Sequence, residues 1–256
     1  MKKIIIFNWK SKPATEKEVV HLLSILKKHP IEKVKIIICP PFIFLNIVKN
    51  IIKKNWRKGC FLGAQNVFWL DRVNATGEIT PQMLKKLGVK YVIIGHSERR
   101  ELLREDDEMI NAKIKASLKH NLVPIVCIGE KQRRKKEFDM QTKRILLNQL
   151  NPAFRGIQIQ PFQKIMIAYE PVWAIGKKES DDFSDVQEVL SFIRLWLKKR
   201  FSEKLASQTA LIYGGSVKSN NIKEFLKIKN LNGLLIGSAS TKTTELNRLL
   251  RVLNTK

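Results

Sequence analysis

The sequence has no apolar run that approaches the roughly 20 residues of a membrane-spanning helix. Its first residues are basic and then apolar, but the apolar part, Ile4–Phe7, is far too short for a secretory signal. Its three cysteines are an odd number and cannot all pair, so a disulfide framework is not indicated. We expect Cys39, Cys60 and Cys127 to be buried thiols in strands, in the reducing cytoplasm.

Acidic residues are also scarce: 23 Asp and Glu stand against 48 Lys and Arg, which gives a net charge of +25. Such a surplus would suit a nucleic-acid partner. The lysines, however, are spread over nearly every amphipathic segment, without interleaved aromatics and without a helix-turn-helix, zinc-finger or RNA-recognition pattern. This distribution argues against nucleic acid and favours solvated helix faces that attract a small anionic substrate.

Short apolar runs alternate with longer amphipathic segments eight times, which predicts parallel strands joined by helices. The strands are expected at Lys3–Phe7, Val34–Cys39, Cys60–Ala64, Val89–Ile94, Leu122–Ile128, Ile165–Tyr169, Thr209–Tyr213 and Gly233–Ile236. The helices are expected at Glu16–His29, Phe42–Lys54, up to Leu87, Glu105–Asn121, Lys131–Leu150, Phe183–Phe201, Lys218–Lys227 and up to Leu253. Eight units in 256 residues predict one eight-stranded parallel (β/α)8 barrel domain over residues 1–256. An open doubly wound sheet is the alternative, but no glycine-rich dinucleotide fingerprint follows the first strand.

Three of the predicted strand ends carry reactive side chains, and barrel active sites form at the C-terminal ends of strands. Glu170 follows the sixth strand, and Pro171 prevents a helix from starting there. Lys10 follows the first strand, where an ammonium group can lie over a bound anion or a polarised carbonyl. His96 follows the fourth strand, and the other histidines cannot build a metal cluster. A base, a cation and an imidazole would then share one pocket.

The connection after Glu170 is apolar at Val172–Ile175, which is unusual for a loop, and is followed by Gly176. An apolar flap could close over the carboxylate, exclude water and let the base act in a dry site. The alternative is an exposed glutamate beside a hydrophobic loop.

Glycine and serine follow the seventh and eighth strands, at Gly214–Ser216 and Gly237–Ser240. Backbone N–H groups at such turns form an anion cradle, and barrels often bind phosphate after these two strands. Tight turns without a ligand are the alternative for each, but their occurrence after both strands favours phosphate.

Several motifs together resemble the triosephosphate isomerase family in content, order and spacing. They are NWK at Asn8–Lys10, GAQN at Gly63–Asn66, TGEIT at Thr76–Thr80, IIGHSERR at Ile93–Arg100, CIGE at Cys127–Glu130, AYEPVWAIG at Ala168–Gly176, YGGSV at Tyr213–Val217 and NGLLIGSAS at Asn232–Ser240. The resemblance covers the chain from Phe7 to Ser240. It implies a TIM barrel that interconverts dihydroxyacetone phosphate and glyceraldehyde 3-phosphate, with no metal or other cofactor.

The resemblance also implies roles for individual residues. Glu170 would move a proton between carbons 1 and 2, His96 would polarise the carbonyl, and Lys10 and Asn8 would stabilise the enediolate oxygens.

Two further residues would support this set: Ser97 would hold Glu170 while the flap is open, and Glu98 would orient Lys10. The substrate phosphate would meet the backbone N–H groups of Gly176, Ser216, Gly237 and Ser238.

The family is a homodimer in which the loop corresponding to that around Thr76 enters the partner subunit, and we expect the same here. Ser11–Lys12 replaces the family's Met-Asn, whose Asn helps to receive that loop, so the contact differs in this chain. Phe7 replaces a glycine before NWK, Lys177–Lys178 replaces Thr-Gly in the flap, and Ser238 replaces the second glycine of the phosphate cradle.

Two other functions are open to such a sequence. A phosphate-sugar aldolase or epimerase would need a lysine deep in the barrel or converging metal ligands, and the sixth strand offers Glu170 instead. A basic RNA-binding scaffold with decayed catalysis would not need Lys10, His96 and Glu170 intact.

Overall fold

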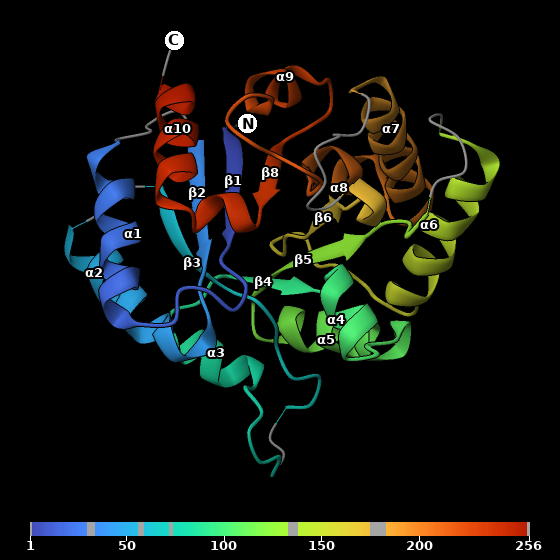
Figure 1. Ribbon diagram of the computed structural model, residues 1–256. Helices are drawn as coiled ribbons and strands as arrows, with labels where there is room; N and C mark the ends of the chain where they lie inside the picture. The colour runs from blue at the N-terminus through green and yellow to red at the C-terminus, as the bar shows by residue number, and fades with distance from the viewer. Residues whose placement is uncertain are drawn as a thin grey trace.

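The eight predicted strands form one closed, all-parallel barrel in the order β1 to β8, with β1 paired to β8. In this computed structural model, the structure describes residues 2–29, 34–55, 59–71, 74–132, 138–174 and 183–254. Figure 1 shows the helices arranged around the ring of strands. The strands are β1 Lys3–Asn8, β2 Val34–Cys39, β3 Cys60–Ala64, β4 Tyr91–Ile94, β5 Val123–Ile128, β6 Met166–Tyr169, β7 Ala210–Tyr213 and β8 Gly233–Ile236. The predicted (β/α)8 barrel is confirmed.

Helices follow the strands as expected, with short one-turn segments between them. The α-helices are α1 Glu16–Lys28, α2 Leu45–Asn55, α3 Pro81–Leu87, α4 Ser97–Leu102, α5 Asp107–Lys119, α6 Met140–Ala153, α7 Phe183–Arg200, α8 Glu203–Gln208, α9 Ile222–Lys227 and α10 Thr243–Asn254. The 3-10 segments are η1 Phe42–Phe44, η2 Val172–Ala174 and η3 Ser238–Ser240.

Two hydrophobic cores result from the alternation of side chains along each strand. In β1, Ile4 and Ile6 point into the barrel, whereas Ile5 and Phe7 belong to the layer between strands and helices. Because both faces of every strand are covered, the strands read as continuous apolar runs, and this is why their positions could be predicted.

The fourth strand begins later than Val89–Ile94, at Tyr91. Gly88, with φ of 96°, ends α3, and the N–H of Val89 donates to the carbonyl of Leu84. The backbone N–H of Val89 is therefore part of the hydrogen bonding that ends α3, and Val89 does not pair in the sheet.

Two short helices were not predicted, α4 and α8, and each begins at a polar cap. The Nδ1 atom of His96 accepts from the N–H of Glu98, and the hydroxyl of Ser202 accepts from the N–H of Leu205. Neither helix is long enough to show an apolar period.

Three expected helices begin later in the chain than their sequence indicates. The helix expected at Glu105–Asn121 begins after its cap Asp106, and that expected at Lys131–Leu150 begins after its cap Asp139. The helix expected at Lys218–Lys227 begins at Ile222. Asp at the first two boundaries accepts a backbone N–H and so fixes the start of the helix.

The cysteines lie in strands and are free, as expected, but they are not equally buried. Cys39 and Cys127 are buried, whereas Cys60 is partly exposed, which corrects that part of the prediction. Burial raises the pKa of the Cys39 and Cys60 thiols. Among the residues described, no helix is long and apolar enough to cross a bilayer.

Candidate functional site

The ends of β1, β4 and β6 bring the three predicted catalytic side chains to one mouth of the barrel. The Nε2 atom of His96 lies 3.5 Å from Oε1 of Glu170. The Nζ atom of Lys10 donates to Oε1 of Glu98. The expected pairing of Lys10 with Glu98 is therefore present in the structure, and it links the end of β1 to the start of α4.

Lys10 has an unusual backbone, with φ of 54° in the left-handed region. For a residue other than glycine this conformation costs about 1–2 kcal/mol. The N–H of Lys10 donates to Oδ1 of Asn8 over 3.1 Å. Nε2 of Gln65 donates to the carbonyls of Lys10 at 2.7 Å and Cys39 at 2.9 Å. Gln65 therefore positions Lys10, a role that sequence reasoning missed.

The tautomer of His96 follows from its position as the cap of α4. The N–H of Glu98 donates to Nδ1 of His96 over 3.2 Å, so Nδ1 carries a lone pair and not a proton. Nε2 then carries the hydrogen of a neutral ring and faces Glu170. The helix N-terminus disfavours a positive charge at the same place. His96 is a positioned hydrogen-bond donor.

Glu170 is only 2% exposed, which is rare for a carboxylate that has no lysine or arginine partner among the described residues. The backbone N–H of Ser97 lies 3.4 Å from its Oε2. The expected contact with Ser97 is present, made by the backbone.

Two glycines, Gly129 and Gly214, lie so close to Glu170 that a side chain at either position would clash with it. A Cβ at Gly129, after β5, would lie 1.8 Å from the carbonyl oxygen of Glu170. A Cβ at Gly214, after β7, would lie 2.8 Å from Cγ of Glu170. No larger residue fits at either position without moving β6. Sequence reasoning assigned Gly214 to an anion cradle and gave Gly129 no role.

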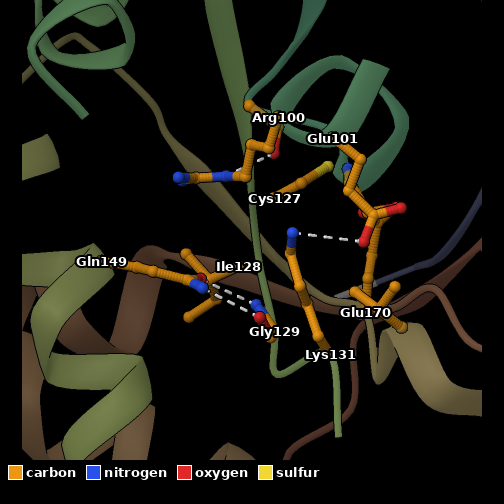
Figure 2. Close-up of a pocket in the computed structure, with 11 residues that line it drawn as sticks. Arg100, Glu101, Cys127, Ile128, Gly129, Lys131, Gln149 and Glu170 are labelled. Atoms are coloured by element: carbon orange, nitrogen blue, oxygen red, sulfur yellow. Dashed lines mark hydrogen bonds and ion pairs between the residues drawn. The ribbon is translucent and has the colours of Figure 1, made fainter. Parts of the chain in front are cut away.

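A small cavity of about 40 Å³ lies beside Glu170 (Figure 2), with room for no more than a few waters. Cys127 lines it, and the pKa of its thiol is raised by burial and then by the negative charge of Glu170. Gln149 fixes one wall, because its side chain donates to the carbonyl of Gly129 at 2.8 Å and accepts from its N–H at 2.9 Å. These contacts hold the glycine that abuts Glu170.

The start of the expected flap is anchored on a buried carboxylate. Glu130 is fully buried and accepts from the Tyr169 hydroxyl at 2.9 Å and from Nε1 of Trp173 at 2.8 Å. Trp173 lies in η2, directly after β6 and Glu170. The rest of the flap, including Gly176, Lys177 and Lys178, lies outside the described residues.

The expected phosphate-binding positions follow β7 and β8. Ser216 is buried at 7% exposure, and Ser238 is exposed at the first position of η3. A Cβ at Gly237 would lie 3.0 Å from Cε of Lys10, so the cradle after β8 adjoins the lysine after β1. The structure thus brings these positions to the mouth that holds Lys10.

A buried ionic cluster lies behind α4, and the sequence gave no sign of it. Glu105 accepts from both Arg99 on α4 and Lys113 on α5. Lys113 is 1% exposed and also donates to Oδ1 of Asn66 at 2.7 Å. Burial lowers the pKa of Lys113, while Glu105 acts to raise it. The cluster ties the helix capped by His96 to the barrel wall.

Replacing Glu105 by Gln should lower the free energy of unfolding by about 3–5 kcal/mol, because Lys113 would be left buried without its ion-pair partner. Because Glu105 acts to raise the pKa of Lys113, its loss should lower that pKa further in the folded variant than in the folded wild type. The variant then gains more stability than the wild type as pH rises, and the deficit should shrink. Urea unfolding across pH measures this. The control is Glu105→Gln with Lys113→Met, which should recover most of the loss; equal stability of the single and double variants would contradict the cluster's role.

Comparison with known proteins agrees with this geometry. The family model described as triosephosphate isomerase matches residues 3–253. A triosephosphate isomerase from Dictyoglomus thermophilum is 40% identical over 244 residues, covering 94% of this chain and 95% of the relative. The enzyme of that name from Caldanaerobacter subterraneus subsp. tengcongensis is 39% identical over 237 residues, which cover 93% of this chain and 94% of the relative. The one from Clostridium tetani is 35% identical over 249 residues, which cover 97% of this chain and 96% of the relative. With a matching barrel, matching motifs and this coverage, the chain belongs to the triosephosphate isomerase family.

Proposed function

We propose that this chain interconverts dihydroxyacetone phosphate and glyceraldehyde 3-phosphate, with Glu170 as the base and His96 as the electrophile. The observation that carries the proposal is the buried Glu170 carboxylate 3.5 Å from Nε2 of a His96 ring whose Nδ1 accepts a hydrogen bond. A base and a fixed donor are thereby side by side in a water-poor site.

In the forward reaction, Glu170 removes a proton from carbon 1, and the electron pair forms the carbon 1–carbon 2 double bond of an enediolate. The negative charge that develops on the carbonyl oxygen is stabilised by Nε2–H of His96 and by the Lys10 ammonium. A proton then passes from the oxygen on carbon 1 to the oxygen on carbon 2, and Glu170 returns its proton to carbon 2. The oxygen on carbon 1 becomes the aldehyde carbonyl, so atoms and electrons balance without a cofactor. A neutral histidine beside a glutamate base is the established pattern of this family.

The substrate phosphate is assigned to the turns after β7 and β8, at the N–H groups of Ser216, Gly237 and Ser238. Gly237 supports this assignment, because its lack of a side chain leaves room beside Lys10. Gly176, outside the described residues, is the fourth expected contact, and Asn8 helps Lys10 at the reacting oxygens.

The test is a coupled assay of the purified chain with each triose phosphate in turn, repeated in deuterium oxide. Conversion in both directions, with deuterium from solvent appearing on the product carbon, is expected because the base exchanges its proton. Absence of conversion in either direction would overturn the assignment.

We also propose a homodimer in which the loop around Thr76 enters a partner subunit. Thr76 and Gly77 are exposed, and the described parts of this loop project from the barrel beyond α3 in Figure 1. Lys10 would lie near the inserted loop. The free cysteines suit a cytoplasmic enzyme.

On dilution, specific activity should fall in parallel with dissociation, by about 10²-fold in the monomer, since a 1 Å displacement of a catalytic group can have that effect. Sedimentation and activity measured over one dilution series test this. Thr76→Lys should promote dissociation by placing a cation near Lys10 and Lys12 of the partner, while Ser207→Lys on exposed α8 should not. A monomer with full activity would contradict the proposal.

A further inference from the structure

A second, larger cavity of about 560 Å³ lies at the opposite end of the barrel from the catalytic mouth. Its lining residues precede or begin β2, β4, β5, β6 and β7, so it opens at the N-terminal ends of the strands. Its volume lies within the roughly 300–1,000 Å³ of typical small-molecule sites. Nothing in the isomerase mechanism uses this end of the molecule.

Three lysines line this cavity: Lys35 in β2, Lys90 directly before β4, and Lys164 two residues before β6. Lys35 precedes the inward-facing Ile37 by two positions, and Lys164 precedes the inward-facing Met166 by two. Because side chains two apart share one face of a strand, Lys35 in β2 occupies a position that faces the barrel axis, whereas Lys164 lies in the connection before β6. Lys35 is half-buried, Lys90 and Lys164 are exposed, and none of the three lies on a helix.

An aromatic pair holds two of these ammonium groups in place. Nζ of Lys90 lies 4.9 Å, and Nζ of Lys35 5.6 Å, from the centroid of the Phe61 ring. Phe61 packs edge-on against Tyr91, which lines the cavity. The ring face stabilises the cations, but one ring cannot neutralise them.

The lysine cluster is not neutralised by carboxylates within the described part of the chain. No aspartate or glutamate is among the lining residues. The pKa of Lys35 is lowered, first by burial and then by the positive charges of Lys164 and Lys90. Like charges gathered around a cavity destabilise the empty protein, which a bound anion would reverse.

The remaining walls are suited to an apolar ring. Leu122, Val123 and Met166 line the cavity, and Phe162 lies among the lining residues with 71% exposure. The side chain of Gln208 also lines it and can pair with polar ring edges. The cavity therefore combines cations with an apolar surface.

We propose that this cavity binds a nucleoside phosphate, with its phosphates at Lys35, Lys90 and Lys164 and its ring against the apolar wall. Lysine ammonium groups bind phosphate as point charges, and three of them match a group with two or more negative charges. The site is separate from the isomerase site, so both can be occupied together.

Calorimetric titration with ADP, adenosine and pyrophosphate tests this, with glycerol 3-phosphate present throughout to fill the isomerase site. ADP should bind more tightly than either fragment. Lys35→Gln/Lys90→Gln/Lys164→Gln should weaken ADP binding by at least about tenfold, because three charge-assisted contacts are lost. The matched control, Lys17→Gln/Lys27→Gln/Lys223→Gln, removes the same charge from exposed helix positions outside the cavity and should change the affinity less than about twofold.

Isomerase activity should be unchanged in both variants, and the melting temperature of the unliganded cavity variant should not fall, since repulsion is relieved. Undetectable ADP binding, or equal losses in both variants, would overturn the proposal. Pyrophosphate or adenosine binding as tightly as ADP would overturn it too, by removing the role of the ring or of the phosphates.

Discussion

Replacing Glu170 by Gln should reduce kcat on the order of 10²–10⁴-fold or more, while the affinity for a substrate analogue changes far less. Glutamine keeps the shape of the side chain but cannot accept a proton from carbon. Gly129 abuts the backbone of Glu170 and Gly214 abuts its side chain, and we expect an amide of the same size to keep both contacts. Steady-state kinetics of the variant and the wild type, measured side by side, give the comparison.

Two measurements make the result specific to the base. The inhibition constant of glycerol 3-phosphate reports whether the phosphate site is intact, and deuterium exchange reports proton transfer without turnover. A loss of activity below tenfold would rule out Glu170 as the base.

Replacing His96 by Asn should reduce kcat by about 10²–10³-fold without a comparable loss of stability, the range observed when one oxyanion donor is removed. The N–H of Glu98 now donates to Nδ1 of His96, and the shorter Asn side chain can accept the same bond. Asn cannot, however, extend a donor toward Glu170 as Nε2 does. The Asn variant therefore tests the catalytic role of His96 while keeping its role as the cap of α4.

His96→Ala is the matched comparison, because it removes both the donor and the cap. It should lose about as much activity as His96→Asn and, in addition, about 1 kcal/mol in the free energy of unfolding. Near-normal kcat in the Asn variant would show that His96 serves α4 only.

The barrel could be predicted from sequence because its strands are buried on both faces. Val34–Cys39, Cys60–Ala64 and Gly233–Ile236 are bounded as predicted. The placement of Lys10, His96 and Glu170 at one end of the barrel could be predicted because each follows such a strand. These three side chains come close together only if the sheet closes into a barrel, and the eight repeated strand–helix units predicted that closure.

Other features could not be predicted, because they depend on contacts between distant segments. Glu105 and Lys113 are two charged residues in a highly charged chain until folding buries them together. The role of Gln65 depends on the left-handed backbone of Lys10, which no local pattern shows. Two helices begin later than predicted because the caps Asp106 and Asp139, and not an apolar period, set the boundary.

The glycines beside Glu170 also limit how this enzyme can be altered by mutation. At Gly129 and Gly214 every other amino acid adds an atom where Glu170 already lies, so single substitutions there should inactivate and not redirect the enzyme. A library that seeks new substrates would gain nothing from these two flanks. Variation that keeps the catalytic geometry is open instead to residues such as Ser216 and Ser238 in the turns after β7 and β8. It is not open to Gly237, whose missing side chain leaves room for Lys10.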